Sequence, residues 1–132
     1  MNQFKIVRYP AEVNSTKVLM HIQCEDELKV LVEDSGKKTK FKAAFEARIR
    51  FLIENGSKAV EHRTWFESLK NNQGLYSIKF ISIDNIRILF TFHRNIAYLL
   101  YSFKETSKGQ DPKSYRYGIK MAYERINDIE EG

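Results

Sequence analysis

The sequence predicts an α+β fold in which N-terminal helices pack on a small antiparallel β-meander sheet and a C-terminal helix follows. Three observations support this prediction. Apolar residues recur at the helical spacing over residues 39–55, and they alternate with polar residues over 74–103. The chain has 132 residues, of which 42% are hydrophobic and 13% aromatic, enough for one well-filled core. We therefore expect residues 1–132 to form a single domain.

The first part of the chain predicts two short strands and a helix. Residues 4–9 are typical of a strand that Pro10 ends, because proline lacks the amide hydrogen that a continuing ladder needs. A second strand is expected at residues 18–22 and a short helix at residues 25–33. The break that follows ends at Gly36.

Residues 39–55 give the clearest helical pattern, and Gly56 supplies its stop. We expect its apolar face to lie in the core; that face comprises Phe41, Phe45, Ile49 and Leu52. A shorter helical piece is expected over residues 58–69, where Trp65, Phe66 and Leu69 are suited to packing.

From Gly74 onward, apolar residues recur at every second position. This alternation predicts three strands near residues 76–80, 86–93 and 96–103. Arg94-Asn95 is suited to a two-residue turn between the last two strands, so the three form an antiparallel meander. A final helix is expected to start at Pro112. Its apolar face comprises Tyr115, Ile119, Ala122 and Ile126.

Charge is concentrated in the meander and the start of the final helix. Residues 73–120 carry eight Lys/Arg against three Asp/Glu, a net charge of +5 that equals the formal charge of the whole chain. Such a block favours a polyanionic partner. A solvated surface explains the charge equally well, so charge alone does not decide between a polyanion-binding surface and an ordinary solvated one.

The sequence argues against several other classes of protein. Cys24 is the single cysteine, which leaves no intrachain disulfide and fits a reducing cytoplasm; a buried thiol is favoured there over a nucleophile. We find no signal peptide or membrane-spanning apolar run. His21, His62 and His93 lack zinc-site spacing, and a phosphate-binding glycine loop is absent. We expect neither a metal nor a cofactor.

Strand alternation places three cations on one face of the meander. If Ile86, Ile88 and the residues that follow at the same period face the helices, Arg87 points to the opposite, open face, and Lys79 shares it. With Arg94-Asn95 as the turn, Arg87 falls opposite Ser102, and Lys104 is its diagonal neighbour.

A bulge in these strands would break this prediction, because one extra residue moves a side chain to the other face. Without a bulge, three clustered cations are suited to bind a phosphodiester. The alternative is three separate, solvated cations.

Several segments resemble the HigB-like, phage-derived branch of the RelE/ParE toxin superfamily. They are GLYSIKF at 74–80, NIRILF at 85–90, LLYSFK at 99–104, KGQDP at 108–112, Leu69-Lys70, and Ala122 with Arg125 on the last helix. The likeness covers about residues 41–126 and is strongest from 74 to 125.

This resemblance implies a RelE-like fold and the toxin of a type II toxin–antitoxin system. It implies a protein antitoxin, commonly of the helix-turn-helix type, with which the toxin can form a hetero-oligomer. Many members cleave messenger RNA on the ribosome without a metal, by directing a ribose 2′-hydroxyl at the adjacent phosphate. The ribosome and mRNA are thus expected partners. The acidic run at residues 25–27 is expected to be solvated or to face the antitoxin.

The resemblance also implies roles for individual residues. Lys79, Arg87 and Lys104 are the expected catalytic residues, with Arg87 as the transition-state clamp and the lysines as phosphate ligands or acid/base groups. The expected RNA-binding residues are Lys108, His93, Tyr98 and Tyr101. The general base stays open among a lysine of lowered pKa, His93 and a tyrosinate. Packing within the sheet is the alternative role for both tyrosines.

The chain departs from the family pattern in two places. Many relatives have arginine at the position of Lys79 and a second lysine where Glu105 stands, and residues 10–36 look like an extra N-terminal element or an antitoxin-binding surface. Two other functions therefore stay open. One is a non-enzymatic, ParE-like inhibitor of a topoisomerase. The other is an inactive relative that acts only as a protein-binding partner, which Glu105 favours.

Overall fold

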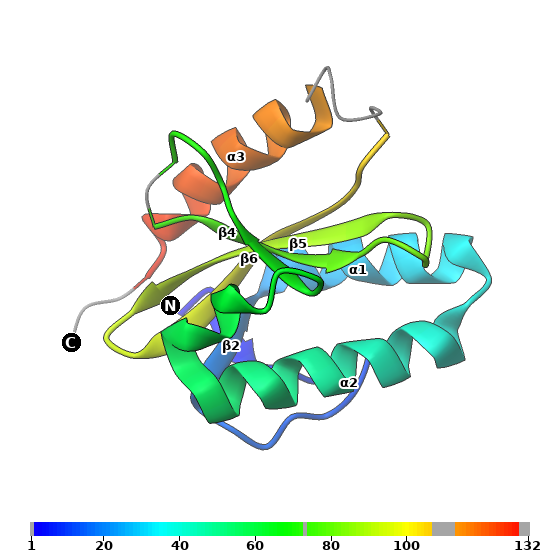
Figure 1. The fold of residues 1–132 in the computed structure, drawn as a ribbon, viewed down its shortest axis with the longest axis horizontal. Coiled ribbons are helices and arrows are strands. Elements are labelled where there is room, and N and C mark those ends of the chain that lie inside the picture. The colour runs from blue at the N-terminus through cyan, green and yellow to red at the C-terminus, as the bar shows by residue number, and fades with distance from the viewer. Residues whose placement is uncertain (1, 73, 107–112, 130–132) are drawn as a thin grey trace.

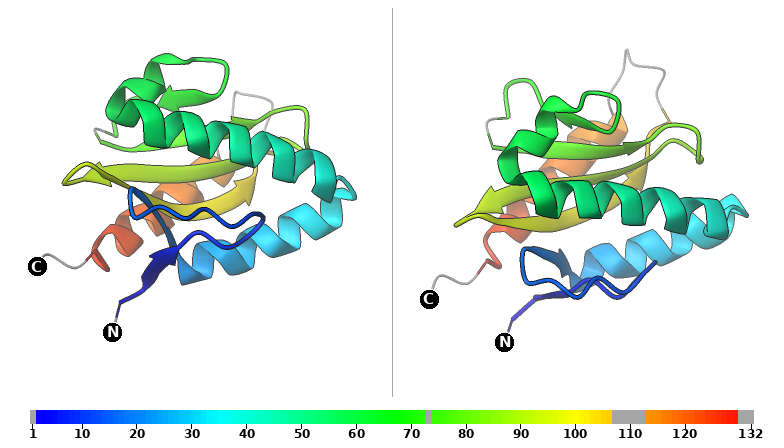
Figure 2. Two further views of the ribbon diagram at one scale, coloured as in Figure 1. Left: turned by 90° about the horizontal axis from the view of Figure 1, so that it is seen from below. Right: turned by 60° about the horizontal axis from the view of Figure 1, so that its bottom comes forward.

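The computed structural model describes residues 2–72, 74–106 and 113–129 and has an α+β architecture of three layers. Helices α1 (Ile22–Ser35) and α2 (Lys38–Asn55) cover one face of a six-stranded sheet, and helix α3 (Lys113–Ile126) covers the other (Figures 1 and 2). The predicted fold class is confirmed, including the C-terminal helix.

The six strands lie in the order β1-β2-β6-β5-β4-β3. Their bounds are β1 Phe4–Ile6, β2 Val18–His21, β3 Phe66–Ser68, β4 Tyr76–Phe80, β5 Ile86–His93 and β6 Ile96–Lys104. The pairs are antiparallel except for β2 and β6, which run parallel. The predicted meander of β4, β5 and β6 is confirmed, and both residues of the Arg94-Asn95 turn have positive φ, as a type I′ hairpin requires.

The helical piece expected over residues 58–69 is wrong in its second half. A short 3₁₀ helix, η1 (Gly56–Glu61), is followed by the edge strand β3, which pairs with β4. Phe66 is fully buried there, so packing and ladder hydrogen bonds decide its conformation over local propensity.

Residues 10–36 are not an added element at the periphery. They contain β2, which pairs with β6 in the middle of the sheet, and α1, whose Cys24, Leu28 and Val32 are buried in the main core.

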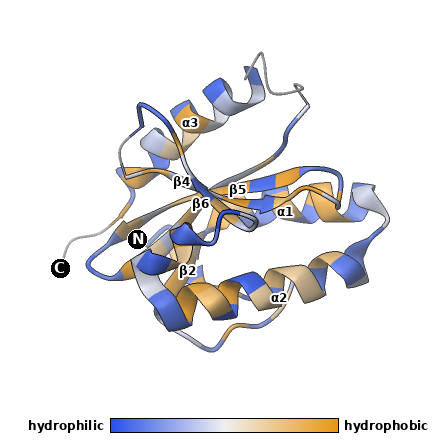
Figure 3. Ribbon diagram, in the orientation of Figure 1, coloured by the Kyte–Doolittle hydropathy of each residue, from blue (hydrophilic) through white to orange (hydrophobic). Residues whose placement is uncertain are grey.

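The main core lies between the sheet and helices α1 and α2. All four residues of the predicted apolar face of α2 are buried, and Phe41 packs on Phe80 with ring centroids 4.4 Å apart. Figure 3 shows that apolar and polar residues are interspersed along α2, as expected for a helix with one buried face. The predicted apolar stripe is therefore confirmed.

The second face of the sheet is not open, contrary to the sequence prediction. Helix α3 packs on it through a smaller core that includes Leu89, Phe103 and Ala122. Gly118 permits this approach, because a Cβ there would lie 3.2 Å from a ring carbon of Tyr101. The prediction of an open face failed because the apolar side of α3 must also be buried. The second face of the sheet was available, since α1 and α2 cover the first.

A bulge in β6 changes the predicted register. Leu89 pairs with Tyr101 and Phe90 with Leu99, so Leu100 is the extra residue. Arg87 consequently lies opposite Phe103 rather than Ser102. Lys104 lies opposite Ile86 and so belongs to the other face from Arg87.

Within the described residues, no helix combines the length and the apolar character needed to cross a bilayer.

Candidate functional site

A polar cluster under the N-terminal half of α3 contains two of the three predicted catalytic residues. We call it the Arg87 cluster; it comprises Glu67, Lys79, Asn85, Arg87 and Tyr115. Arg87 Nε donates to the Tyr115 hydroxyl at 3.0 Å, and that hydroxyl donates to Glu67 Oε1 at 2.6 Å. Arg87 Nη1 donates to Asn85 Oδ1 at 2.7 Å.

Strand register brings the cluster together on the α3 face of the sheet. Lys79 on β4 is the direct antiparallel partner of Arg87 on β5, so both side chains lie on one face with Cβ atoms about 5 Å apart. Glu67 on β3 pairs with Ser77 on β4, two residues before Lys79 and therefore on the same face. The predicted proximity of Lys79 and Arg87 is confirmed.

Arg87 is a nearly buried cation, with 8% of its surface exposed. Its partners are the Tyr115 hydroxyl, the Asn85 amide oxygen and the Ile86 carbonyl, which are all neutral. Across the described ranges, no carboxylate lies within ion-pair distance of it. Because a buried charge without a counter-charge is costly, a bound anion would stabilise this arrangement.

Tyr115 is a proton donor in this cluster. Burial, together with its hydrogen bond to Glu67, raises the pKa of Tyr115 to about 12. The phenol is therefore protonated at neutral pH, which argues against Tyr115 as a tyrosinate base. Glu67 is the carboxylate of the cluster; its Oε1 accepts the hydrogen bond from Tyr115, and the carboxylate has further lone pairs.

A polar groove of about 740 Å³ runs beside the cluster. Its wall includes Glu67 and Lys79 from the cluster and two further cations, Arg63 and Lys70. Lys79 Nζ donates to the Arg63 carbonyl at 2.6 Å, so its ammonium is held at this wall by a neutral partner. The groove gives an anion a route to the side of the cluster where Lys79 lies.

Lys104 does not join the cluster. Its side chain is 51% exposed and lies 3.8 Å from Asp84 in an ion pair. The predicted convergence of three cations is therefore wrong, and its cause is the Leu100 bulge, which reverses the face of every β6 residue beyond it.

Among the described residues, none of the predicted RNA-binding residues belongs to the Arg87 cluster. Tyr98 is 8% exposed and packs edge-on against Phe4, so it is not available to a base in this conformation. Tyr101 is half-buried against the Arg125 guanidinium, 5.2 Å from its ring. His93 lies six residues from Arg87 along β5, about 20 Å away. Lys108 lies outside the described residues.

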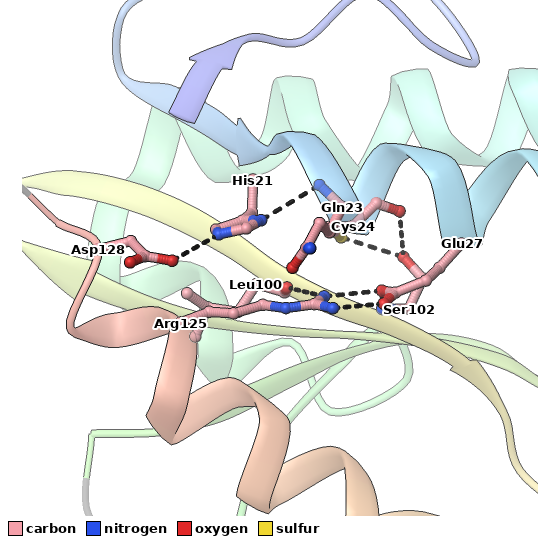
Figure 4. Close-up of polar contacts among 8 residues, drawn as sticks. All are labelled: His21, Gln23, Cys24, Glu27, Leu100, Ser102, Arg125 and Asp128. Carbon is pink, nitrogen blue, oxygen red and sulfur yellow. Dashed lines mark hydrogen bonds and ion pairs between the residues drawn. The ribbon is translucent and has the colours of Figure 1, made fainter. Parts of the chain in front are cut away.

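A second polar cluster, the Arg125 cluster, joins the C-terminal half of α3 to α1 (Figure 4). Arg125 makes a bidentate pair with Glu27, at 2.8 Å from Nη1 to Oε1 and 2.6 Å from Nη2 to Oε2. Its Nη1 also donates to the carbonyl of the bulge residue Leu100 at 2.9 Å. Glu27 additionally accepts from the Ser102 amide at 3.2 Å. Glu27 is thus not simply solvated, contrary to the sequence interpretation of the acidic run.

Cys24, His21 and Asp128 lie near one another in Figure 4 but do not form a nucleophile–base pair. Cys24 Sγ contacts Ser102 Oγ at 3.1 Å, and burial raises the pKa of its thiol to about 12. Both ring nitrogens of His21 have other partners, the Gln23 amide and Asp128 Oδ2. The predicted buried thiol is confirmed.

Sequence reasoning missed Glu67, Asn85 and Tyr115 as members of the site. Glu67 was assigned to a helix that does not form, and Tyr115 was counted only as part of an apolar helical face. Asn85 carried a usable signal, because it directly follows Asp84 at a turn, and both have positive φ in the structure.

Neither a family model, nor a curated protein, nor a solved structure matches this chain. Within the described ranges, no three or more His, Cys, Asp or Glu side chains gather in a way that could hold a metal ion.

Proposed function

We propose that this chain is the toxin of a type II toxin–antitoxin system and acts in the cytoplasm as a ribosome-dependent, metal-independent mRNA endoribonuclease. One observation supports the proposal most: the nearly buried Arg87 has no carboxylate partner among the described residues, and Lys79 lies directly across from it. Both residues belong to the segments that resemble the HigB-like toxins. A protein antitoxin would be its partner in a hetero-oligomer.

The arrangement is suited to cleavage by the ribose 2′-hydroxyl. In that reaction the 2′-oxygen attacks the adjacent phosphorus, the bond to the 5′-oxygen breaks, and a cyclic phosphate and a free 5′-hydroxyl remain. The proton leaves the 2′-hydroxyl for a base, and the 5′-oxygen gains one. Arg87 and Lys79 would stabilise the extra negative charge of the phosphorane.

Glu67 is the candidate base that the structure adds to this scheme. Its carboxylate lines the groove and contacts the Tyr115 hydroxyl, which also contacts Arg87. A phosphate entering beside Lys79 would therefore meet Glu67 as a proton acceptor, and the Tyr115 phenol and Arg87 would follow Glu67 in the hydrogen-bond chain. This combination supports general acid–base catalysis without a metal.

The test is induced expression in bacteria with mapping of RNA ends. We expect growth arrest and new cleavage sites within translated transcripts. Glu67→Gln keeps the size of the side chain and its contact with Tyr115, and should lower cleavage about 100-fold or more. The matched control is Lys42→Gln, on the exposed side of α2 across the sheet from the cluster.

Other outcomes would contradict the proposal. Growth arrest with intact transcripts and a DNA-damage response would instead indicate topoisomerase inhibition. Absence of both arrest and cleavage, with binding to the antitoxin retained, would indicate a partner that acts by binding alone.

A further inference from the structure

The outer face of α3 carries cations and exposed aromatic rings that the Arg87 cluster does not use. We call it the α3 ridge; it comprises Lys113, Arg116, Tyr117, Lys120 and Tyr123. All five are exposed, with 56% of Tyr117 and 41% of Tyr123 open to solvent. The buried face of the same helix carries Gly118, Ala122 and Arg125. The ridge is thus the side of α3 that faces away from the sheet.

Helical geometry arranges the ridge as a basic stripe between two tyrosines. At about 100° per residue, Lys113, Arg116 and Lys120 fall within an arc of about 60°. Tyr123 lies about 20° beyond one edge of this arc, and Tyr117 about 40° beyond the other. Lys113 and Lys120 are about 10 Å apart along the axis, so the stripe spans more than one phosphate.

Basic residues outnumber acidic ones on the outer face of α3. The first turn of α3 has no acidic residue, and the earliest acid on its outer face is Glu124, near the C-terminal end. Lys113 and Arg116 stand near the helix N-terminus, where the macrodipole disfavours cations. A basic stripe placed against the dipole favours an anionic ligand.

The two tyrosines are positioned but remain exposed. Tyr117 packs edge-on against Tyr101 with centroids 6.0 Å apart, and the Tyr123 hydroxyl donates to Asn72 Oδ1 at 3.3 Å. Each ring is thereby held by a neighbour while much of its surface stays in water. Ordered aromatic rings beside cations are the feature on which unstacked bases of single strands bind.

We propose that the α3 ridge binds single-stranded RNA, with phosphates on Lys113, Arg116 and Lys120 and bases stacked on Tyr117 and Tyr123. The choice of RNA over DNA rests on the proposed function. The basic stripe and the paired aromatics point to a single strand independently of it. The same helix carries Tyr115 on its inner side, against Arg87. RNA on the ridge would therefore run along the helix that covers the Arg87 cluster.

The test is a titration of the full chain with a fluorescent single-stranded RNA of about 12 nucleotides, a usual site size for single-strand binders. Its riboses carry 2′-O-methyl groups, so that it cannot be cleaved. Replacing Lys113, Arg116 and Lys120 together by Gln should weaken binding at least about tenfold. It should also lower the slope of log affinity against log salt by about 2, at 0.7 per phosphate contact.

The matched control replaces three exposed cations of α2, Lys40, Lys42 and Arg50, by Gln. It makes the same change in net charge on the other side of the sheet. We expect its affinity to stay within about twofold of the wild type. Equal losses in both triple variants would mean that net charge alone attracts RNA, and would overturn the proposal.

The stacking part has its own variants. Tyr117→Ala and Tyr123→Ala should each weaken binding about five- to a hundredfold, and Tyr117→Phe should keep the wild-type affinity because the ring remains. Duplex RNA of the same sequence should bind more weakly. Unchanged affinity in both alanine variants would overturn this part.

The outcomes separate this proposal from the proposed function. Wild-type binding to the ridge without any mRNA cleavage in cells would overturn only the endoribonuclease. Cleavage in cells with full RNA affinity in the α3 triple variant would overturn only the ridge. A DNA strand of the same sequence that binds as tightly as RNA would show that the ridge does not select RNA, contrary to our proposal.

Discussion

Two buried arginines, Arg125 on α3 and Arg87 on the strand β5 beneath it, differ in their surroundings. Arg125 and Arg87 are 5% and 8% exposed, so both are essentially buried on the same face of the sheet. Arg125 has a bidentate carboxylate, a carbonyl and the face of Tyr101 around it. Arg87 has a phenol, an amide and a carbonyl. Arg125 thus has a carboxylate as counter-charge, whereas the partners of Arg87 in the described part of the chain are neutral hydrogen-bonding groups.

This difference indicates separate roles for the two ends of α3. Burial alone lowers the pKa of Arg125, but its hydrogen bonds and charge interaction with Glu27 outweigh burial and raise it. Arg125 also supplies the hydrogen bond for the Leu100 carbonyl at the bulge, so it fixes both the helix and the irregular strand. The hydrogen-bond partners of Arg87 among the described residues are neutral. Its positive charge would therefore be available to an anionic ligand.

The largest expected effect on stability comes from Arg125→Met. It removes the counter-charge of Glu27 and the donor to the Leu100 carbonyl, and should lower the free energy of unfolding by about 3 kcal/mol. Urea denaturation measures this. The double variant Arg125→Met with Glu27→Met should recover part of the loss, because no unpaired charge remains. A loss below about 1 kcal/mol in the single variant would refute the structural role.

Arg87→Met should have little effect on stability and a large effect on RNA cleavage, in contrast to Arg125→Met. It removes a buried charge that has no carboxylate partner among the described residues, so the free energy of unfolding should change by no more than about 1 kcal/mol. Cleavage in cells should fall about 100-fold or more, because the transition-state charge loses its closest cation. Unfolding as severe as that of Arg125→Met would place Arg87 with the structural residues instead.

Tyr115 should make the stability of the protein depend on pH in the alkaline range. Its pKa in the folded protein is raised from 10.0 to about 12, so the protonated phenol is favoured by folding. Its contribution is fully present below about pH 10 and is lost as the pH rises through about 12, a loss of about 2 kcal/mol. The measurement is the difference in unfolding free energy between wild type and Tyr115→Phe at about pH 9 and pH 12. A constant difference would show that Tyr115 is not held as described.

The smallest effect concerns the two lysines that sequence analysis treated alike. Lys104→Gln breaks an exposed pair with Asp84 and should change stability by no more than about 0.5 kcal/mol. It should also affect cleavage far less than Lys79→Gln, since Lys79 lies opposite Arg87 and Lys104 on the other face. Equal losses of cleavage in the two variants would support the original prediction of a three-cation site.

Much of the fold could be predicted because it depends on local periodicity. The apolar face of α2 and the alternation in β4, β5 and β6 each follow from one segment read alone. Strand β3 could not be predicted, because Phe66 is buried through pairing with a strand ten residues away in the sequence. The parallel pairing of β2 with β6 is likewise a long-range contact with no local signal.

The candidate site was predictable only in part, for the same reason. Alternation correctly placed Lys79 beside Arg87, because β4 and β5 pair without an irregularity. It misplaced Lys104, because strand alternation does not reveal the bulge at Leu100, whose carbonyl accepts a hydrogen bond from Arg125 on another element. Glu67 and Tyr115 come from β3 and α3, and only their common position on one sheet face joins them to Arg87.

The sequence by itself determined the α+β class, the basic meander and the common face of Lys79 and Arg87, since each follows from the period of single helices and strands. The tertiary structure decided which face α3 covers, which cation the bulge removes, and which arginine has no carboxylate partner among the described residues. The physical reason is that burial and charge pairing are properties of groups brought together from distant segments. Local sequence does not encode that proximity.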